Sequence, residues 1–378
     1  MRIGIDYTPG IRQGAGVGHF VRNVVAALLK LDRENSYTLM YSRANESEAA
    51  PVLPVAPNVS GRALLLSERM LNILWYKLSL PIPIELLGPR ADVYYFPDFA
   101  LPPVRRTRTV ITVHDLSFLL VPDCAEVGLR THLEKVVPMS VRHADFVTAD
   151  SENTRNDLTT LLDVEPERVA VVYGGVDPRF HPITDEIELQ TTRVKYGLFS
   201  PFILYVGTIE PRKNLGRLLQ AYTRLRKKKN IRHRLVIAGG LGWLYHDVLR
   251  EIEELTADNE VIFLGRVPDD DLPSLYSLAD LFVFPSLYEG FGLPPLEAMA
   301  CGVPVVCSNS SSLPEVVGDA GVLVSPLDTD ALSDAIGELL ADPVQRAEFG
   351  RRGRDRSRLF TWDRSARQLL DICYRVAK

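Results

Sequence analysis

Short apolar runs alternate with segments of helical periodicity along most of the chain. This alternation is typical of parallel sheets that are covered by helices on both faces. In the first half of the chain, strands are predicted at residues 3–6, 37–42, 93–96, 110–114, 146–149 and 169–172. In the second half, they are predicted at residues 202–206, 234–238, 261–264, 281–284, 303–307 and 322–324. The pattern therefore predicts an α/β protein with two similar sets of strands.

A segment rich in glycine and proline separates the two sets. Residues 173–183, with the sequence YGGVDPRFHPI, have little periodicity and are typical of a linker. We therefore predict two Rossmann-like, doubly wound domains, at residues 1–178 and 184–360, that face each other across a cleft. Ligands bind beyond the carboxyl ends of the strands in such sheets, so two facing domains suit a two-substrate site. Residues 361–378 carry apolar side chains at helical spacing and are predicted to form a packed helix.

Length and composition agree with this organisation. At 378 residues the chain is long for a single core, and its 46% apolar and 24% charged residues match an ordinary soluble protein. The net charge of -5 gives no general attraction to nucleic acid, so no nucleic-acid partner is expected. The four cysteines lack Cys-x-x-Cys spacing, which indicates neither a zinc site nor a disulfide framework and favours a reducing cytoplasm. The first residues, MRIGID, are typical of a strand and not of a signal peptide, and no run of 18 apolar residues predicts a spanning helix.

Two carboxylates flank a loop rich in glycine and proline, in the sequence LYEGFGLPPLEAMACG at residues 287–302. Glu289 is predicted to lie in the loop after a buried strand, and Glu297 on the next helix, which ends near Gly302. A glycine-rich turn lets a ligand approach the backbone, and a helix amino terminus offers N–H groups to an anion. Because carboxylates accept hydrogen bonds from neighbouring hydroxyls, the arrangement suits a phosphate that carries a polyol. The alternative is that Glu297 favours the helix dipole and Glu289 is solvated.

Two cations stand near the start of the second set of strands, in FILYVGTIEPRKNLGRLLQAY. A strand is predicted to end at Gly207, and a helix to begin near Asn214, a candidate N-cap. Arg212 and Lys213 come directly before that helix, so they can converge with its N–H groups on one pyrophosphate. The alternative is a pair of solvated surface charges.

A glycine-rich loop, GAGVGHF at residues 14–20, follows the first strand and opens a helix. Its glycines lack the G-x-G-x-x-G spacing of a dinucleotide site, and no acidic residue ends the second strand, which argues against a nicotinamide cofactor. The loop suits close approach of the backbone to a phosphate or an acceptor, or else it is a flexible turn. His114 and Asp115 are predicted where another strand ends. A lone histidine is more often structural than catalytic, so His114 alone indicates little.

Taken together, these motifs resemble those of the retaining glycosyltransferases of family 4. The resemblance centres on the E-x7-E pair, Glu289 and Glu297, within EGFGLPPLEAMACGVPVV, and it covers nearly the whole chain. Members of this family have the two-domain GT-B fold, and the resemblance implies that the carboxy-terminal helix crosses back onto the first domain. Further matches are the glycine loop at 14–18, HDLSF at 114–118, SENTRNDL at 151–158, YGGVD at 173–177, YVGTIEPRKNL at 205–215 and SLPEVVGDAG at 312–321.

The resemblance also implies roles for the candidate residues. Glu297 should hold the nucleotide ribose and Lys213 the pyrophosphate, while Glu289 holds the donor sugar together with the backbone of the loop that follows. His114 should lie near the transferred sugar, and the Gly16 loop should approach the phosphates when the cleft closes. The expected catalytic residues are His114, Glu289, Arg212 and Lys213. The expected donor-binding residues are Gly16, Gly18, Arg212, Lys213, Val267, Glu289, Gly290, Phe291, Gly292, Leu293 and Glu297.

One residue departs from the family pattern. Many members carry Gly-Arg at the end of the strand before the lysine, whereas this chain has Thr208 at the arginine position. We expect Arg212, beside Lys213, to supply the missing cation. VGTIEPRKNL in this form resembles bacterial mannosyltransferases that use GDP-mannose in polysaccharide assembly, although related members use other donors. The donor implied is therefore GDP-mannose, with a UDP-sugar as the alternative.

The reaction implied is transfer of a hexose from a nucleotide diphosphate to a saccharide or lipid-linked saccharide acceptor, with retention at the anomeric carbon. Cations and helix N–H groups aimed at the leaving phosphate stabilise the negative charge that develops there. No Asp-x-Asp follows directly after a strand, and the DDD at 269–271 is predicted to start a helix, so neither a metal nor another cofactor is expected. A sugar-nucleotide epimerase of the same fold and a non-catalytic nucleotide-sugar binding module remain as alternatives.

The segment from Glu68 to Leu87 mixes the basic residues Arg69 and Lys77 with several large apolar residues. Such a segment can touch a lipid-linked acceptor at a membrane surface, although helices this apolar are more often part of a core. We therefore expect a cytoplasmic protein, with peripheral contact on the inner face of the cell membrane as a further hypothesis.

Overall fold

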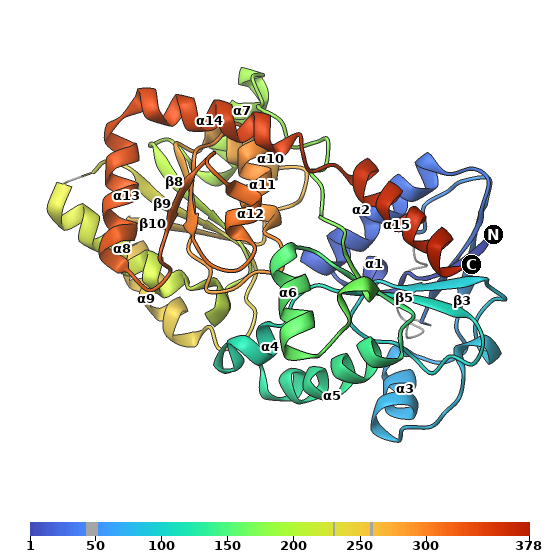
Figure 1. Ribbon diagram of the computed structural model, residues 1–378. Coiled ribbons are helices and arrows are strands. Elements are labelled where there is room, and N and C mark those ends of the chain that lie inside the picture. Colours follow the sequence, from blue (N-terminus) through green and yellow to red (C-terminus); the bar gives the residue numbers. More distant parts are fainter. Residues whose placement is uncertain (43–51, 230, 258–259) are drawn as a thin grey trace. The chain divides into compact units, whose positions relative to one another are not determined.

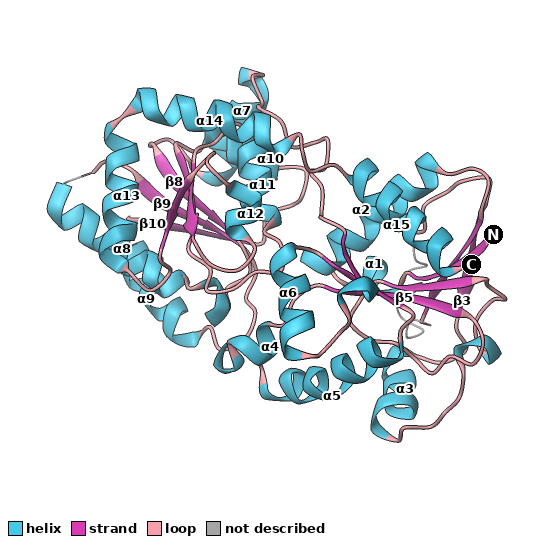
Figure 2. Ribbon diagram, in the orientation of Figure 1, coloured by secondary structure: helices cyan, strands magenta, loops and turns pink. Residues whose placement is uncertain are grey.

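The computed structural model describes residues 1–42, 52–229, 231–257 and 260–378. The chain forms two compact units (Figure 1). The first unit consists of Met1–Leu116, Gly128–Gly175 and Thr361–Lys378, and the second consists of Ser117–Val127 and Val176–Phe360. Each unit has its own parallel sheet (Figure 2).

The strands of the first unit are β1 (Arg2–Asp6), β2 (Ser36–Tyr41), β3 (Val59–Ala63), β4 (Val93–Phe96), β5 (Arg108–Val113), β6 (Phe146–Ala149) and β7 (Val169–Val171). Among the described residues they form a seven-stranded parallel sheet in the order β3-β2-β1-β4-β5-β6-β7. The central strands are apolar and buried, as expected where helices cover both faces of a parallel sheet. The order reverses between β1 and β4, so the carboxyl edge at this switch point is the expected ligand-binding side.

The strands of the second unit are β8 (Phe202–Val206), β9 (Arg234–Ala238), β10 (Val261–Gly265), β11 (Leu281–Phe284), β12 (Val305–Ser308) and β13 (Val322–Val324). In the described part of this unit they form a six-stranded parallel sheet in the order β10-β9-β8-β11-β12-β13. Its switch point lies between β8 and β11. The loops after these two neighbouring strands must therefore meet at one edge of the sheet.

Helices connect the strands and cover both sheets. Because right-handed crossovers run in opposite directions from each switch point, they place helices on opposite faces (Figure 1). The helices before the linker are α1 (Thr8–Arg12), α2 (Gly16–Leu31), α3 (Glu68–Asn72), α4 (Ser117–Leu120), α5 (Val127–His143) and α6 (Glu152–Leu161). Those after it are α7 (Glu186–Tyr196), α8 (Leu215–Lys229), α9 (His246–Ala257), α10 (Leu272–Leu278), α11 (Leu293–Ala300), α12 (Leu313–Val317), α13 (Thr329–Ala341), α14 (Pro343–Ser357) and α15 (Trp362–Val376).

Every strand predicted from the apolar runs is confirmed, with ends that agree to within two residues. The predicted strand at 303–307 begins instead at Val305, because the backbone N–H of Val303 donates to the carbonyl of Ala298 at the end of α11. The sequence did not predict β3, an edge strand whose residues are mostly exposed. An exposed edge strand lacks the buried apolar face on which the prediction depends.

The carboxy-terminal helix α15 belongs to the first unit, as the resemblance implied. It packs against α2 and β5, and the Trp362 ring lies edge-on to that of Phe20 at 5.6 Å between centroids. The hydroxyl of Ser365 donates to the carbonyl of Tyr173 at 2.5 Å. A Cβ at Gly175 would lie 2.3 Å from the backbone nitrogen of Trp362, so only glycine permits this close packing.

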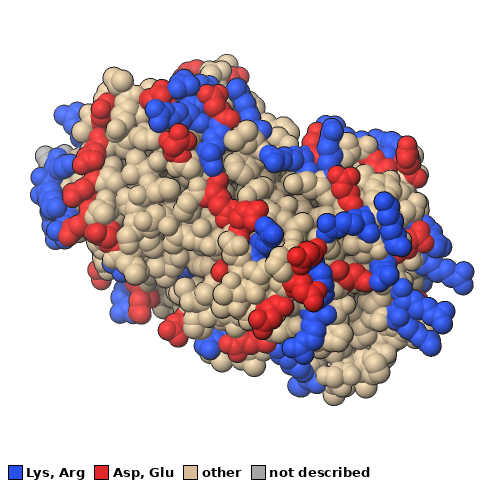
Figure 3. Space-filling view, viewed as in Figure 1, with Lys and Arg blue, Asp and Glu red and all other residues tan. Residues whose placement is uncertain are grey.

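The segment from Glu68 to Leu87 combines the two alternatives considered for it. Helix α3 continues as a π-helical turn, η1 (Ile73–Lys77), in which Trp75 is buried and its indole N–H donates to the carbonyl of Ile82 at 2.9 Å. Met70 and Leu78, in contrast, are about half exposed, at 50% and 57%. No helix in the described part of the chain is long and apolar enough to cross a bilayer. Figure 3 shows basic and acidic side chains interspersed over the face in view.

Candidate functional site

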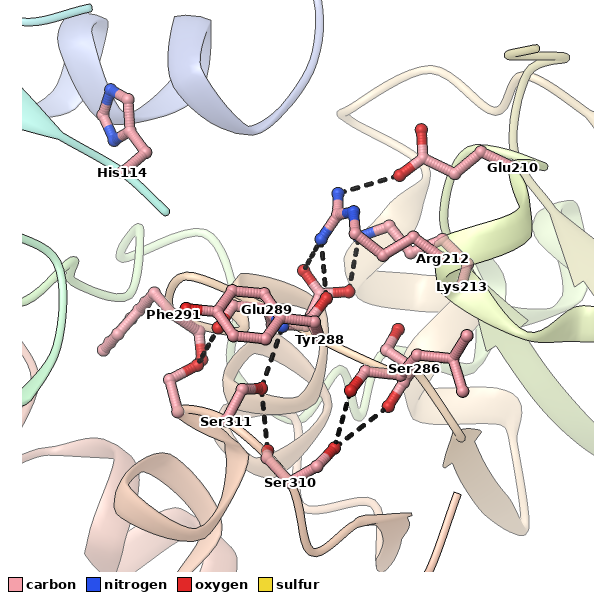
Figure 4. A network of polar contacts seen from close by, with 12 residues as sticks. His114, Glu210, Arg212, Lys213, Ser286, Tyr288, Glu289, Phe291, Ser310 and Ser311 are labelled. Carbon is pink, nitrogen blue, oxygen red and sulfur yellow. Dashed lines mark hydrogen bonds and ion pairs between the residues drawn. The ribbon is translucent and has the colours of Figure 1, made fainter. Parts of the chain in front are cut away.

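The loops after β8 and β11 bring three of the predicted site residues together. Arg212 and Lys213 lie in a short 3-10 turn, η5 (Pro211–Lys213), after β8, and Glu289 lies in the loop after β11. Because β8 and β11 are neighbours at the switch point, these loops meet at the carboxyl edge of the second sheet. Figure 4 shows Arg212 between Glu289 and a further carboxylate, Glu210.

The four charged groups form a closely paired network. One terminal nitrogen of Arg212, Nη1, donates to Glu289 Oε2 at 3.0 Å and to the carbonyl of Tyr288 at 2.8 Å, and Nη2 donates to Glu210 Oε1 at 2.8 Å. Lys213 Nζ donates to Glu289 Oε1 at 2.7 Å. Both oxygens of Glu289 therefore hold a cation. The network joins two cations to two carboxylates, so its formal charges sum to zero.

The network keeps Glu289 ionised although its side chain is only 8% exposed. Burial alone would raise the pKa of this carboxyl, but Arg212 and Lys213 outweigh it and lower the pKa to about 2. The alternative of a solvated glutamate is thereby wrong for Glu289. The alternative of solvated surface cations is wrong as well, because the Arg212 and Lys213 side chains are 17% and 12% exposed.

Asn214 lies directly before α8, as predicted, but it does not have the backbone of a usual N-cap. Its φ of 58° is left-handed, whereas an N-cap is normally extended. Its side-chain amide instead donates to the carbonyls of Pro285 and Pro326, at 2.9 and 2.8 Å. Asn214 thus ties the start of α8 to the loops that follow β11 and β13.

The loop between Glu289 and α11 is fixed by a serine cluster that the sequence did not identify as part of the site. The buried hydroxyl of Ser312 donates to the carbonyls of Glu289 and Phe291, at 2.9 and 2.6 Å. The backbone N–H of Glu289 donates to the hydroxyl of Ser311 at 2.9 Å. Gly292 precedes α11 with a φ of 116°, which only glycine adopts without strain. These bonds hold the backbone of Gly290, Phe291 and Gly292 in one conformation before the helix amino terminus.

Glu297 lies on α11, as predicted, but apart from the ion-pair network. Its Oε2 accepts a hydrogen bond from the Tyr276 hydroxyl at 3.1 Å. Burial raises the pKa of Glu297 to about 8, and the nearby carboxylates Asp269 and Asp177 add to this effect. Glu297 is therefore mostly protonated at neutral pH and can both donate and accept hydrogen bonds. Of the other predicted donor-binding residues in this unit, Val267 is buried and Leu293 is half-buried at the start of α11.

His114 follows β5 in the first unit and is buried. Its Nδ1 lies 2.7 Å from Asp150 Oδ2 and its Nε2 lies 2.7 Å from the carbonyl of Pro97. Burial alone would lower the pKa of His114, but Asp150 and Asp98 outweigh it and raise the pKa to about 9. Both ring nitrogens are thus hydrogen-bonded within the first unit. The catalytic role of His114 stays a prediction.

Gly16 and Gly18, which were predicted in a loop after the first strand, lie instead in α2, which α1 separates from β1, and they differ in their surroundings. Gly18 lies inside α2, where an added Cβ would be 1.8 Å from the carbonyl oxygen of Gln13, so this position needs glycine for packing. Gly16 is the first residue of α2, and an added Cβ would meet no atom within 4 Å. The space around Gly16 is compatible with close approach of a ligand, which stays a prediction for both glycines.

Glu210 and Asp150, the carboxylates that pair with Arg212 and His114, were not predicted from the sequence. A signal existed for each. Glu210 lies two residues before Arg212, and Asp150 directly follows the predicted strand at 146–149, where polar residues reach the carboxyl edge of a parallel sheet.

Comparisons with known proteins agree over both units. Residues 14–180 match the family described as Glycosyltransferase Family 4, and residues 191–356 match Glycosyl transferases group 1. The chain is 38% identical over 280 residues to O-antigen chain mannosyltransferase B of Escherichia coli, which covers 74% of this chain and 73% of that protein. It is 29% identical over 314 residues to the GDP-mannose-dependent alpha-(1-6)-phosphatidylinositol monomannoside mannosyltransferase of Mycolicibacterium smegmatis, covering 80% and 76% of the two chains. Among solved structures it is similar to sucrose-phosphate synthase from Thermosynechococcus elongatus, with a TM-score of 0.77 and 22% identity over 99% of this chain and 98% of that one, a likeness that concerns the fold alone.

Proposed function

The chain belongs to glycosyltransferase family 4, and we propose that it is a retaining, metal-independent mannosyltransferase that uses GDP-mannose. The observation that carries the proposal is the meeting of Arg212, Lys213 and Glu289 at the switch point of the second sheet. Such an edge of a GT-B unit suits a nucleotide diphosphate sugar. The mannosyl group and its GDP carrier are supported by the names of the relatives, of which one is a GDP-mannose-dependent mannosyltransferase. The acceptor proposed is a saccharide of a growing glycan.

Transfer breaks the bond between the anomeric carbon and the diphosphate oxygen, and negative charge develops on the leaving phosphate. Arg212, Lys213 and the N–H groups at the amino terminus of α11 are the groups proposed to stabilise this charge without a metal ion. Glu289 and the backbone of the fixed loop after it would bind the hydroxyls of the sugar, and Glu297 would bind the ribose diol. The acceptor hydroxyl would attack on the face that the phosphate leaves, and its proton would pass to that phosphate.

A screen of nucleotide sugars by thermal shift tests the donor. A ligand that binds only the folded state stabilises it by about 2.7 kcal/mol at one hundred times its Kd. We expect GDP-mannose to raise the melting temperature more than UDP-glucose, UDP-N-acetylglucosamine or ADP-glucose. A larger shift with a UDP-sugar would replace the donor and leave the family reaction in place.

Proton NMR of the product tests the stereochemistry. We expect an α-linked product from the α-linked donor, and the same rate with excess chelator present. A β-linked product would contradict retention. Loss of activity in chelator would contradict only metal independence, and an isomeric sugar nucleotide in place of free GDP would indicate an epimerase.

We further propose that the first unit contacts a membrane surface through the exposed part of the segment 68–87. The exposed residues Met70 and Leu78 are flanked by the exposed cations Arg69 and Lys77, a combination that favours the interface of an anionic bilayer. Trp75 is unsuitable for a test because its side chain belongs to the core. We expect Met70→Glu with Leu78→Glu to reduce flotation with vesicles that contain phosphatidylglycerol. Equal flotation of the folded variant and the wild type would remove the membrane role.

A further inference from the structure

Glu210 is the one member of the ion-pair network to which the proposed reaction gives no task. It follows β8, its side chain is 4% exposed, and its Oε1 accepts from Arg212 Nη2 at 2.8 Å. A carboxylate is costly to bury unless a partner compensates it, and here the partner is one of the two cations proposed to bind the diphosphate. Glu210 therefore competes with the donor for the charge of Arg212.

The two cations of the network are held very differently. Arg212 is fixed by two carboxylates, Glu210 and Glu289, and by the carbonyl of Tyr288. Its own carbonyl accepts from the backbone N–H of Leu287 at 2.8 Å. Lys213 Nζ, in contrast, has a single carboxylate partner among the described residues, Glu289 Oε1. An ammonium group on a flexible stem can change partners more easily than a guanidinium fixed at both of its terminal nitrogens.

The charge balance makes such a change of partners necessary. Two cations and two carboxylates leave no net charge to attract a diphosphate. A diphosphate that approached this network without rearrangement would place its charges beside a buried, ionised Glu289. If Lys213 passes from Glu289 to the diphosphate, the repulsion is relieved and one oxygen of Glu289 becomes available to the sugar hydroxyls.

One buried hydroxyl that the charges of the network influence has no hydrogen-bond partner among the described residues. Tyr205 Oη is fully buried and has no hydrogen-bond partner among the described residues. The charges of Glu289, Glu210 and Arg212 all act on this hydroxyl, whose pKa burial raises well above its usual value.

We infer that Glu210 is a positioning residue for the proposed transfer, which anchors and neutralises Arg212 so that Lys213 alone exchanges Glu289 for the donor diphosphate. The inference rests on the proposed function. It modifies the expectation that Arg212 supplies the cation missing at Thr208, because Arg212 would act on the diphosphate through Glu289 and not by direct contact.

The substitution Glu210→Gln tests this role, because it keeps the shape of the side chain and removes its charge. The network then carries one net positive charge, so GDP should bind roughly three- to tenfold more tightly. Turnover should fall by a similar factor, since a released Arg212 holds both Glu289 and the product diphosphate. A purely structural role predicts weaker GDP binding together with lower turnover. Affinity for guanosine, which lacks the diphosphate, should not change.

Glu260→Gln is the matched control. Glu260 pairs with Arg226 at 2.9 Å and precedes β10, at the amino edge of the same sheet. It changes the net charge of the protein equally but lies away from the carboxyl edge, so GDP affinity and turnover should stay at the wild-type values. Isothermal titration calorimetry and initial rates at one ionic strength measure all these variants.

Glu210→Asp provides a second variant with the charge retained. Its shorter side chain weakens the contact with Arg212, so GDP affinity should rise less than in Glu210→Gln, and turnover should fall less. Unchanged or weaker GDP binding in both variants would overturn the inference while leaving the proposed function intact. If the wild type binds neither GDP nor another nucleoside diphosphate, the proposed function fails and the inference fails with it.

Discussion

At the scale of single residues, the two glutamates of the E-x7-E pair differ in charge. Glu289 is held ionised by two cations, whereas Glu297 is held mostly protonated at neutral pH by burial. The sequence places both beside the same helix and gives no sign of this difference, because it depends on partners brought from other elements. Arg212 is 77 residues from Glu289, and Tyr276 is 21 residues from Glu297. A carboxylate that accepts and a carboxylic acid that also donates suit different parts of one ligand.

The difference predicts opposite dependences of stability on pH for two matched substitutions. The folded-state pKa of Glu297, about 8, lies above its unfolded value, so its contribution to stability is complete below about pH 4.5 and is lost as the pH rises through 8. The glutamine of the variant Glu297→Gln cannot titrate. The free energy of unfolding of this variant, relative to that of the wild type, should therefore increase as the pH rises from 5 to 9, by on the order of 3 kcal/mol. Chemical unfolding at several pH values measures this. A constant difference across that range would show that Glu297 is ionised in the folded protein.

Glu289→Gln is the control, for which the dependence of stability on pH should have the opposite direction. The folded-state pKa of Glu289, about 2, lies below its unfolded value, so its contribution is present above about pH 4.5 and is lost as the pH falls through 2. The variant leaves Arg212 and Lys213 with one carboxylate between them and should lose roughly 3 to 5 kcal/mol at pH 7. The loss should shrink towards pH 3. An equal loss at pH 7 and pH 3 would assign the effect to packing instead of charge.

At the scale of elements, apolar periodicity was sufficient to predict the buried strands but not the edge strand β3. Strands such as β4 and β6 are fully buried, so their apolar runs stand out from the polar segments around them. β3 pairs with β2 at the edge of the sheet, and its residues Ser60, Gly61 and Arg62 carry no apolar signal. The site follows the same rule. Its residues were predicted where they end a strand or open a helix. Asp150 was missed because its pairing with His114 joins residues that are 36 apart, whereas Glu210 was missed although it lies only two residues before Arg212.

The start of α2 offers an element-scale test, because it has a glycine needed for packing and a glycine beside open space. Gly18→Ala would force a Cβ to within 1.8 Å of the Gln13 carbonyl and should destabilise the protein by roughly 1 to 3 kcal/mol. Gly16→Ala has room for its Cβ and should be neutral or stabilising by up to about 1 kcal/mol. If the Gly16 backbone contacts the donor, this second variant should lose transfer while keeping its melting temperature. Wild-type activity in Gly16→Ala would remove that contact from the proposal.

At the scale of the whole molecule, neither structural unit is formed by one continuous stretch of the sequence. The second unit takes Ser117–Val127 from within the first half of the chain, and the first unit takes Thr361–Lys378 from the end. The helical periodicity of residues 361–378 predicted a helix with one buried face. The resemblance to the family predicted that this helix packs on the first domain. Periodicity could not predict its partner, because an amphipathic face fits many surfaces. The contacts of Trp362, Ser365 and Tyr374 with the first unit supply that information.

Because α15 packs within the first unit, a substitution in this helix should destabilise the first unit and leave the stability of the second unit unchanged. Trp362→Ala removes a buried ring that packs on Phe20, which should cost roughly 3 to 5 kcal/mol in the first unit. Trp362→Phe is the matched control, since the indole N–H has no hydrogen-bond partner among the described residues and the ring contact is largely kept. In hydrogen exchange, we expect Trp362→Ala to accelerate exchange in α2 and β5, the neighbours of α15, while the amides of β8 and β9 keep their protection. GDP affinity should remain within about twofold of the wild type, because the ion-pair network of Arg212, Lys213 and Glu289 lies wholly in the second unit. Equal acceleration in β8 and β9 would mean that the two units unfold as one, and the helix would then stabilise the molecule as a whole.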